Sequence, residues 1–296
     1  MHDLQRKQEL RAEAWLLLVV FVWAANYPLA KWAIGGMNVA IFNAIRFITA
    51  PAVAAIIMAS RSAWKPVERA SLRRILSTGV VAHILYQVVF MYGLSLTSAG
   101  NSAVFMATSP LWTLFINAKL HKEKIGAAMW LGMGISLIGI VSIIIGSGRE
   151  FSLGGKAIFG DLICLMSAMF WGLQSNLQKP LVADYSVFQL TFLLTAVGGI
   201  GLSLLAIPAA VTFPWQETPW IYFAAAIASG AVSIGMGNIL WSNGLKRIGP
   251  GRTSNFSNLI PVLAFALAYF TLHEEVTLIQ LCGVAVTMVG VGVARR

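Results

Sequence analysis

The sequence predicts an all-α integral membrane protein with ten transmembrane helices, built as two inverted five-helix repeats with both termini in the cytoplasm. Three observations lead to this fold class. The composition is too apolar for a soluble domain, the basic residues gather on alternate loops, and the second half of the chain repeats the first.

The composition places the chain in a bilayer. Of its 296 residues, 58% are hydrophobic and only 11% are charged, whereas a soluble domain carries about 25% charged residues. Apolar runs of about 20 residues, the length that crosses a bilayer as a helix, recur along the whole chain. The predicted helices lie at 14–33, 38–59, 72–95, 100–118, 126–146, 157–177, 187–210, 220–244, 252–271 and 276–294.

The net charge of +10 indicates topology and not a nucleic-acid partner. If the N-terminus lies in the cytoplasm, 17 of the 21 Lys and Arg residues fall at the inner ends of predicted helices. Only Lys31, Arg149 and Lys156 fall at the outer ends, and Arg46 lies inside a predicted helix. An excess of basic residues in cytoplasmic loops is the positive-inside pattern.

An internal repeat appears when the sequence is aligned with itself at an offset of 151 residues. The aligned pairs are Gly93 and Gly244, Gly100 and Gly251, Pro110 and Pro261, Glu123 and Glu274, Gly132 and Gly283, and Gly139 and Gly290. Nearer the start of each half, an offset of 148 aligns Trp23 with Trp171 and Asn26 with Gln174.

We therefore predict a first repeat over residues 1–147 and a second over 148–296, which together form one membrane domain. Because five is an odd number, the second repeat enters the membrane from the opposite side. Inverted repeats are a transporter architecture, with the substrate site near the midplane between the repeats. The alternative is a duplicated structural bundle, which would not need polar residues at lipid depth.

The paired motifs resemble those of the drug/metabolite transporter superfamily, EamA type. They comprise a Trp in the first helix of each half, a Pro in the fourth, and a Glu-x8-Gly spacing from Glu123 and from Glu274. The resemblance covers essentially the whole chain and implies a 5+5 transporter, most similar to the bacterial amino-acid exporters. One departure, HKE at 121–123 in place of Gly before Glu, affects the tightness of that hairpin turn.

Matched polar faces on the first and sixth predicted helices indicate two walls of one substrate cavity. Their members are Trp23, Asn26 and Tyr27 in the first helix and Trp171, Gln174 and Ser175 in the sixth. Each set follows the spacing of a single helix face. The alternative role is hydrogen bonding between helices.

The third and eighth predicted helices add aromatic, amide and imidazole side chains to this cavity. They are His83, Tyr86 and Gln87 in the third helix and Asn238 and Trp241 in the eighth. An ionisable residue at lipid depth is a functional candidate, so His83 is a candidate proton carrier. A neutral, hydrogen-bonded histidine is the alternative.

Arg46 lies about 12 Å into the second predicted helix at 1.5 Å per residue. Two roles are open for it. It could bind a substrate carboxylate, or it could bind helix-end carbonyls and stabilise the fold.

The fourth and ninth predicted helices carry polar residues and a shared proline. The Gly-Pro-Gly at 249–251 predicts a tight cytoplasmic turn before the ninth helix. Ser257 and Asn258 then extend a polar stripe toward the cavity, and Asn101 belongs to the corresponding stripe of the first copy. Pro110 and Pro261 each remove a backbone hydrogen bond, which makes them candidate hinges.

Together these features predict a secondary transporter of the inner membrane that exports small metabolites, above all amino acids, by alternating access. The alternatives are a multidrug exporter of lipophilic compounds, which would need a membrane-embedded Glu to hold a cation, and an integral membrane enzyme. An enzyme would need a nucleophile–base pair or metal ligands. We expect no cofactor, no metal site and no nucleic-acid partner. The expected partners are the substrate and the lipid bilayer, with the protein a monomer or weak homodimer.

Overall fold

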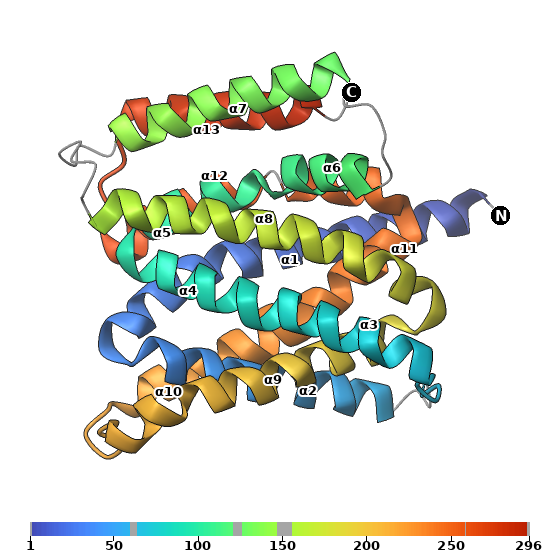
Figure 1. Cartoon of the computed structure of the whole chain (residues 1–296). Helices are drawn as coiled ribbons and strands as arrows, with labels where there is room; N and C mark the ends of the chain where they lie inside the picture. Colours follow the sequence, from blue (N-terminus) through green and yellow to red (C-terminus); the bar gives the residue numbers. More distant parts are fainter. Residues whose placement is uncertain (1, 60–63, 121–125, 147–155, 258, 295–296) are drawn as a thin grey trace.

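The computed structural model describes residues 2–59, 64–120, 126–146, 156–257 and 259–294. Within these ranges the regular structure is helical, and no strand occurs. The helices run along one another as a bundle (Figure 1). The predicted all-α class is therefore confirmed.

Seven helical stretches in the described part of the chain are long and apolar enough to cross a membrane. Five of them lie in α1 (His2–Gly36), α2 (Val39–Ala59), α7 (Ala127–Gly146), α8 (Lys156–Asp184) and α9 (Val187–Thr212). Two shorter apolar helices follow near the end of the chain, α12 (Leu259–Leu272) and α13 (Leu278–Ala294).

The other two stretches each contain a π-helical segment. The first joins α3 (Arg69–Gly79), the π segment η1 (Val80–Leu85) and α4 (Tyr86–Leu96). The second joins α10 (Trp220–Ala228), the π segment η2 (Ser229–Met236) and α11 (Gly237–Phe256). The offset of 151 places 80–85 on 231–236, so the two segments occupy matching positions. Such segments are rare and often lie at functional sites.

The predicted helix 100–118 is divided into two short helices, α5 (Ala99–Ala107) and α6 (Ser109–Leu120). The division falls at Thr108, whose hydroxyl donates to the carbonyl of Phe105 at 2.6 Å. A similar division separates the end of α11 at Phe256 from the start of α12 at Leu259.

The tight turn predicted at 249–251 is wrong, because α11 continues through these residues to Phe256. The φ angle of a proline is close to that of an α-helix, so Gly-Pro-Gly does not by itself end one.

Helices far apart in the sequence form the main pairs of the bundle. Helix α7 packs along α13, α2 along α9 and α5 along α12. Further close pairs are α1 with α11, α1 with α12, α4 with α8 and α6 with α8. In Figure 1, α7 and α13 lie side by side along one edge of the bundle.

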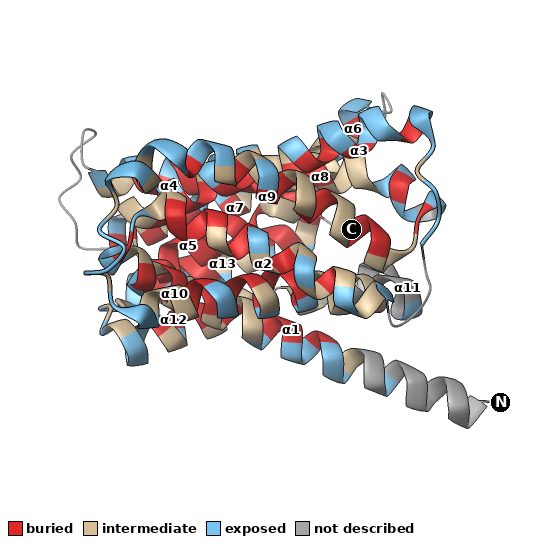
Figure 2. Ribbon diagram, turned by 90° about the horizontal axis from the view of Figure 1, so that it is seen from below, coloured by how far each residue is buried: buried red, intermediate tan, exposed pale blue. Residues whose placement is uncertain are grey.

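Large apolar side chains cover the outside of the bundle, including Ile56, Leu137 and Phe270, which are 71%, 57% and 73% exposed. Figure 2 shows the buried residues on the inner faces of the helices and the exposed ones on the outer faces. Apolar exteriors of this extent mark a surface that does not face water. The chain is a multi-pass membrane protein whose outer faces contact lipid.

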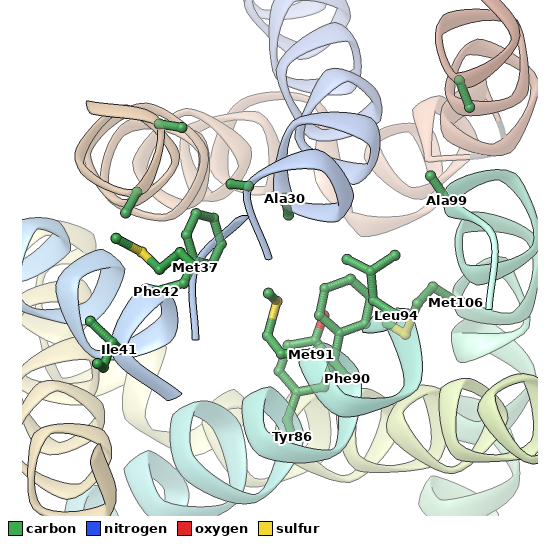
Figure 3. Packing of buried hydrophobic residues seen from close by; sticks show 14 of the residues in the cluster. Ala30, Met37, Ile41, Phe42, Tyr86, Phe90, Met91, Leu94, Ala99 and Met106 are labelled. Carbon is green, nitrogen blue, oxygen red and sulfur yellow. The ribbon is translucent and has the colours of Figure 1, made fainter. Parts of the chain in front are cut away.

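The largest buried apolar cluster among the described residues combines side chains of α1, α2, α4 and α5 with smaller ones from other helices. Tyr86, Phe90 and Leu94 project from α4 toward the part of α1 that carries Ala30 (Figure 3). Helix α5 adds Ala99 and Met106 to the same cluster. The interior between α1, α4 and α5 is therefore packed with apolar side chains.

Candidate functional site

Six aromatic side chains from four helices meet inside the bundle. This aromatic cluster consists of Trp23 and Tyr27 of α1, Tyr86 and Phe90 of α4, Trp171 of α8 and Trp241 of α11. The Trp23 ring centroid lies 5.1 Å from that of Trp241 and 6.2 Å from that of Trp171. Tyr86 meets Trp171 edge to face at 5.2 Å. Ring pairs at these distances stabilise one another beyond simple burial.

The π segment η2 positions the Trp23 ring. The indole Nε1 of Trp23 donates to the carbonyl of Ser233 at 2.9 Å. A Cβ at Gly237 would lie 2.6 Å from the same nitrogen. A glycine is therefore needed at 237 for this ring to reach the segment.

Another tryptophan, Trp112 of α6, lies outside the aromatic cluster and beside helix α8. A Cβ at Gly172 would lie 2.8 Å from the Trp112 backbone, so the two helices approach closely here. In the described part of the chain, the Trp112 indole Nε1 is the buried side-chain donor that lacks a partner. A buried donor without a partner is costly, and a ligand could supply one.

Arg46 stands at the centre of a buried polar network. Its Nε donates to Ser229 Oγ at 2.8 Å, and its Nη1 donates to Gln87 Oε1 at 3.2 Å. Asn43 Oδ1 accepts a third bond from Nη1, also at 3.2 Å. The Ser229 hydroxyl in turn donates to Asn26 Oδ1 at 2.5 Å. Residues of four helical stretches are thus joined around one guanidinium that is only 2% exposed.

A separate polar network lies toward the end of the bundle that carries Lys31. Thr97 Oγ1 donates to the carboxylate of Asp161, and Asn101 Nδ2 donates to the same oxygen at 3.5 Å. Gln280 Nε2 donates to Asn101 Oδ1 at 3.2 Å. These bonds join α5, α8 and α13.

Glu274 and Lys31 add further bonds at the same end. The Glu274 carboxylate accepts from the backbone nitrogens of Ala99 at 2.8 Å and Gly100 at 3.2 Å. It therefore caps α5 from the distant segment between α12 and α13, as expected of a carboxylate at a helix N-terminus. The Lys31 ammonium donates to the carbonyls of Leu94 and Ser95 at 2.8 and 3.0 Å. These contacts join α1, α4, α5 and the segment between α12 and α13 at this end of the bundle.

The structure brings together eight of the residues predicted to line the cavity or lie near it. The aromatic cluster contains Trp23, Tyr27, Tyr86, Trp171 and Trp241, and the Arg46 network contains Asn26, Gln87 and Arg46. Asn26 neighbours Tyr27 in α1, and Gln87 neighbours Tyr86 in α4. The two groups are thus adjacent along the chain.

Other predicted residues lie elsewhere. Ser175 donates to the carbonyl of Trp171 within α8, and Gln174 is buried. Asn101 belongs to the Asp161 network. Asn238 is half-buried in α11, and Ser257 is half-buried just beyond its end. Asn258 lies outside the described residues.

His83 is not part of the aromatic cluster. Its ring lies 5.3 Å from that of Phe47 in α2, and its Cβ would contact a side chain at Gly198 in α9. The π segment accounts for this placement. A π-helix has more residues per turn than an α-helix, so residue 83 is rotated away from the face that an α-helical spacing shares with Tyr86.

Two residues of the Arg46 network were not among the predicted cavity residues, namely Ser229 and Asn43. Ser229 had a usable signal, because the offset of 151 aligns it with Thr78 and both copies carry a hydroxyl there. Asn43 lies one turn before Arg46, on the same helix face.

The two candidate hinge prolines lie at helix starts. Pro110 is the second residue of α6 and Pro261 the third residue of α12. A missing N–H costs least in the first turn of a helix. Both prolines therefore follow directly on the places where the helical stretches are divided.

Two grooves on the outside of the bundle have almost wholly apolar linings. One lies between α2 and α9, beside Phe47 and Gly199, and the other between α12 and α13, beside Phe265 and Val284. Neither is lined by residues of the aromatic cluster. Among the described residues, no group of three His, Cys, Asp or Glu side chains could hold a metal ion.

Comparison with known families gives two matches to one model. The model of the EamA-like transporter family matches residues 10–145 and again residues 158–296.

Curated relatives of similar length carry transporter names. The uncharacterized transporter YyaM of Bacillus subtilis is 26% identical over 90% of this chain and 88% of its own length. The Bacillus subtilis transporter YoaV is 22% identical over 93% of this chain and 94% of its own. A probable terminal-alkyne amino-acid exporter of Streptantibioticus cattleyicolor is 22% identical over 95% of this chain and 92% of its own.

The chain is also similar to a protein of known crystal structure. The two superpose with a TM-score of 0.71 over 96% of this chain and 98% of the other, at 19% identity. At this identity the likeness concerns the fold alone.

Proposed function

This chain belongs to the EamA-like transporter family, and on that premise we propose that it exports amino acids by alternating access. The proposed path is a central cavity between two inverted five-helix repeats, 1–147 and 148–296. The amino-acid exporter among its relatives, at 22% identity, points to the same class of substrate.

One observation carries the proposal, namely that the aromatic cluster adjoins the Arg46 network inside the bundle, since Met91 bonds to Arg46 and packs in the same buried cluster as Tyr86 and Phe90. Aromatic faces attract ammonium groups and accept apolar side chains, while amides and a guanidinium suit a carboxylate. An amino acid carries all three kinds of group. A lipophilic cation would be repelled by Arg46, and no acidic side chain among the described residues bonds to this arginine.

The arrangement of the helices supports the inverted repeats. A two-fold axis would pair each helix with its own mate, as in α2 with α9 and α7 with α13. It would also relate the contact between α1 and α11 to the contact between α8 and α4, and both contacts are present. The two family-model matches and the two matched π segments point the same way.

The state of the structure supports alternating access. The end that carries Lys31 holds the Asp161 network and Glu274. Toward the other end, α6 and the second half of α8 are lined by half-buried residues, including Thr113 and Ser175. The end of the proposed path that carries Lys31 is thus bridged by side-chain bonds between helices, as expected of one of two alternating states.

We expect the purified protein in proteoliposomes to exchange a labelled, bulky neutral amino acid such as phenylalanine. Trp171→Ala removes the ring that meets both Trp23 and Tyr86. Because an aromatic contact contributes about 1 kcal/mol or more, the variant should need roughly tenfold more substrate for half-maximal counterflow. Counterflow at graded substrate concentrations, over a panel of amino acids and a lipophilic quaternary ammonium compound, is the measurement.

Leu137→Ala is the matched control, because this side chain lies on the lipid-facing side of α7 and is 57% exposed. It should exchange substrate as the wild type does. Equal losses in both variants would contradict the assignment of Trp171 to the substrate path. Transport of the ammonium compound in preference to every amino acid would favour the multidrug alternative.

The orientation can be tested with single cysteines at two exposed positions, Ala70 and Gln216. Each is introduced into a variant from which the native Cys164 and Cys282 have been removed. The positive-inside distribution places Ala70 in the cytoplasm and Gln216 outside. A membrane-impermeant maleimide applied to intact cells should label Gln216→Cys only. Labelling of both from the same side would contradict the inverted topology.

A further inference from the structure

Among the described residues, no acidic side chain bonds to Arg46 and neutralises its charge. Its partners are the neutral oxygens of Ser229, Asn43 and Gln87, the Met91 Sδ at 3.2 Å from Nη1, and the face of the Phe42 ring, 5.6 Å away. An arginine side chain keeps its charge in proteins. A buried charge with only neutral partners is expensive, so this position favours the arrival of an anion.

The hydrogen bonds around Arg46 have a fixed direction. Gln87 accepts through its oxygen, and Asn26 accepts through its oxygen from Ser229, which itself accepts from Arg46. The Gln87 oxygen therefore faces the arginine directly, and the Asn26 oxygen is linked to it through Ser229. Because a side-chain amide has one oxygen and one NH2 group, each NH2 group is left to point elsewhere.

Both NH2 groups reach accessible space. No hydrogen bond from either amide nitrogen is recorded among the described residues, and Asn26 and Gln87 are 8% and 6% exposed. The Trp112 indole nitrogen is fully buried without a hydrogen-bond partner, but neither of these amide nitrogens is. Each amide nitrogen therefore keeps some accessible surface.

We propose that the NH2 groups of Asn26 and Gln87 bind the carboxylate of the transported molecule, and that Arg46 acts behind them as a positioning residue. Arg46 orients both amides and adds long-range attraction for the anion, while its own nitrogens stay bonded to protein oxygens. Free carboxylates are therefore the selected class of substrate. This inference rests on the proposed function and specifies which end of the substrate is recognised.

Competition against wild-type counterflow tests the inference without a mutation. The competitors are the leading amino acid of the panel, for instance phenylalanine, its amide, its decarboxylated amine and its deaminated carboxylic acid. Hydrogen bonds to a charged group contribute enough that the amide and the amine should compete roughly 10- to 100-fold more weakly than the amino acid. The deaminated acid should compete better than the amine.

Gln87→Glu tests the role of the NH2 group. This change keeps an oxygen for Arg46 and gives it a carboxylate partner, but it removes the NH2 donor and adds a negative charge. The preference for the amino acid over its amide should fall to about one or reverse. This ratio is the readout, because a merely structural defect lowers transport of both compounds equally.

Asn176→Ala is the matched control. This amide already donates its NH2 group to the carbonyls of Gly172 at 2.9 Å and Thr113 at 3.1 Å. It has no such donor to offer a substrate, so the variant should keep the wild-type ratio.

The outcomes separate the two proposals. If wild-type protein exchanges amino acids and the amide competes as well as the acid, the carboxylate inference is wrong and the proposed function stands. An unchanged ratio in a stable Gln87→Glu variant would also overturn the inference. If no amino acid of the panel is exchanged, the proposed function fails and takes the inference with it.

Discussion

Gly139→Val is expected to prevent the protein from folding stably, whereas Gly134→Val on the same helix should be tolerated. A Cβ at Gly139 would lie 2.5 Å from the backbone nitrogen of Thr287 and 2.6 Å from the carbonyl oxygen of Gly283. Both atoms belong to the backbone of α13, so no side-chain rotation relieves the overlap. Helix association in membranes depends on small residues that let backbones approach this closely.

The effect should be large, because the contact is repeated along the helix pair. A Cβ at Gly132 would lie 2.5 Å from the Gly290 carbonyl, and one at Gly290 would lie 2.6 Å from the Gly132 carbonyl. Separating α7 from α13 at one contact therefore weakens the others as well. We expect a loss at or above about 3 kcal/mol, the upper part of the range for an overfilled core.

Thermal unfolding in detergent, followed by size-exclusion chromatography with fluorescence detection, measures the effect. Gly134 and Gly292 are the controls, since nothing lies within 4 Å of a Cβ added at either position. Gly134→Val and Gly292→Val test the cost of valine itself on α7 and α13. If Gly139→Val unfolds at the same temperature as these two variants, the close packing of α7 on α13 is contradicted.

The glycine contacts also show how far the sequence could predict the fold. The offset of 151 identifies Gly132 with Gly283 and Gly139 with Gly290 as equivalent positions. In the structure the equivalents do not meet each other. Gly139 meets Gly283, and Gly132 meets Gly290. This exchange is what an isologous contact around a two-fold axis produces. The repeat in the sequence identifies the equivalent positions, but which of them meet depends on how the helices dock.

The sequence repeat also predicted residues of the candidate site, but it did not predict all of their contacts. Trp23 and Trp171 align in the sequence repeat, and in the structure their ring centroids lie 6.2 Å apart. The placement of His83 could not be predicted, since no residue pattern marks the π segment that rotates it. The partners of Arg46 were equally hidden, because Ser229 and Gln87 reach it from other helices.

Alanine at Pro110 or at Pro261 is expected to slow transport, with substrate binding close to normal. Each proline lies just after a division in a helical stretch, at Thr108 in one half and between α11 and α12 in the other. Leu111 bonds back to the carbonyl of Thr108 at 2.9 Å, and Ile260 to that of Ser257 at 3.1 Å. These are the tightened bonds of a first helical turn. Alanine restores the missing N–H and allows the two short helices to join into one stiffer helix.

Pro208→Ala is the control for a change of proline in a membrane helix. Pro208 lies inside the uninterrupted helix α9 and is exposed on the outer face of the bundle. It should transport at the wild-type rate. A comparable slowing in this variant would mean that any proline in these helices affects transport.

The two hinge variants should bias the protein toward opposite sides, because inverted repeats give equivalent elements opposite duties in alternating access. A cysteine at the half-buried Ser175 reports which side reaches the cavity. Its labelling by an impermeant reagent is compared from each side of oriented vesicles in the Pro110→Ala and Pro261→Ala backgrounds. Stiffening the stretch formed by α5 and α6 should shift labelling in one direction. Stiffening the equivalent stretch, from the end of α11 into α12, should shift it in the other. If both variants transport at the wild-type rate, or both shift labelling the same way, the prolines only shape static helices and the hinges lie elsewhere.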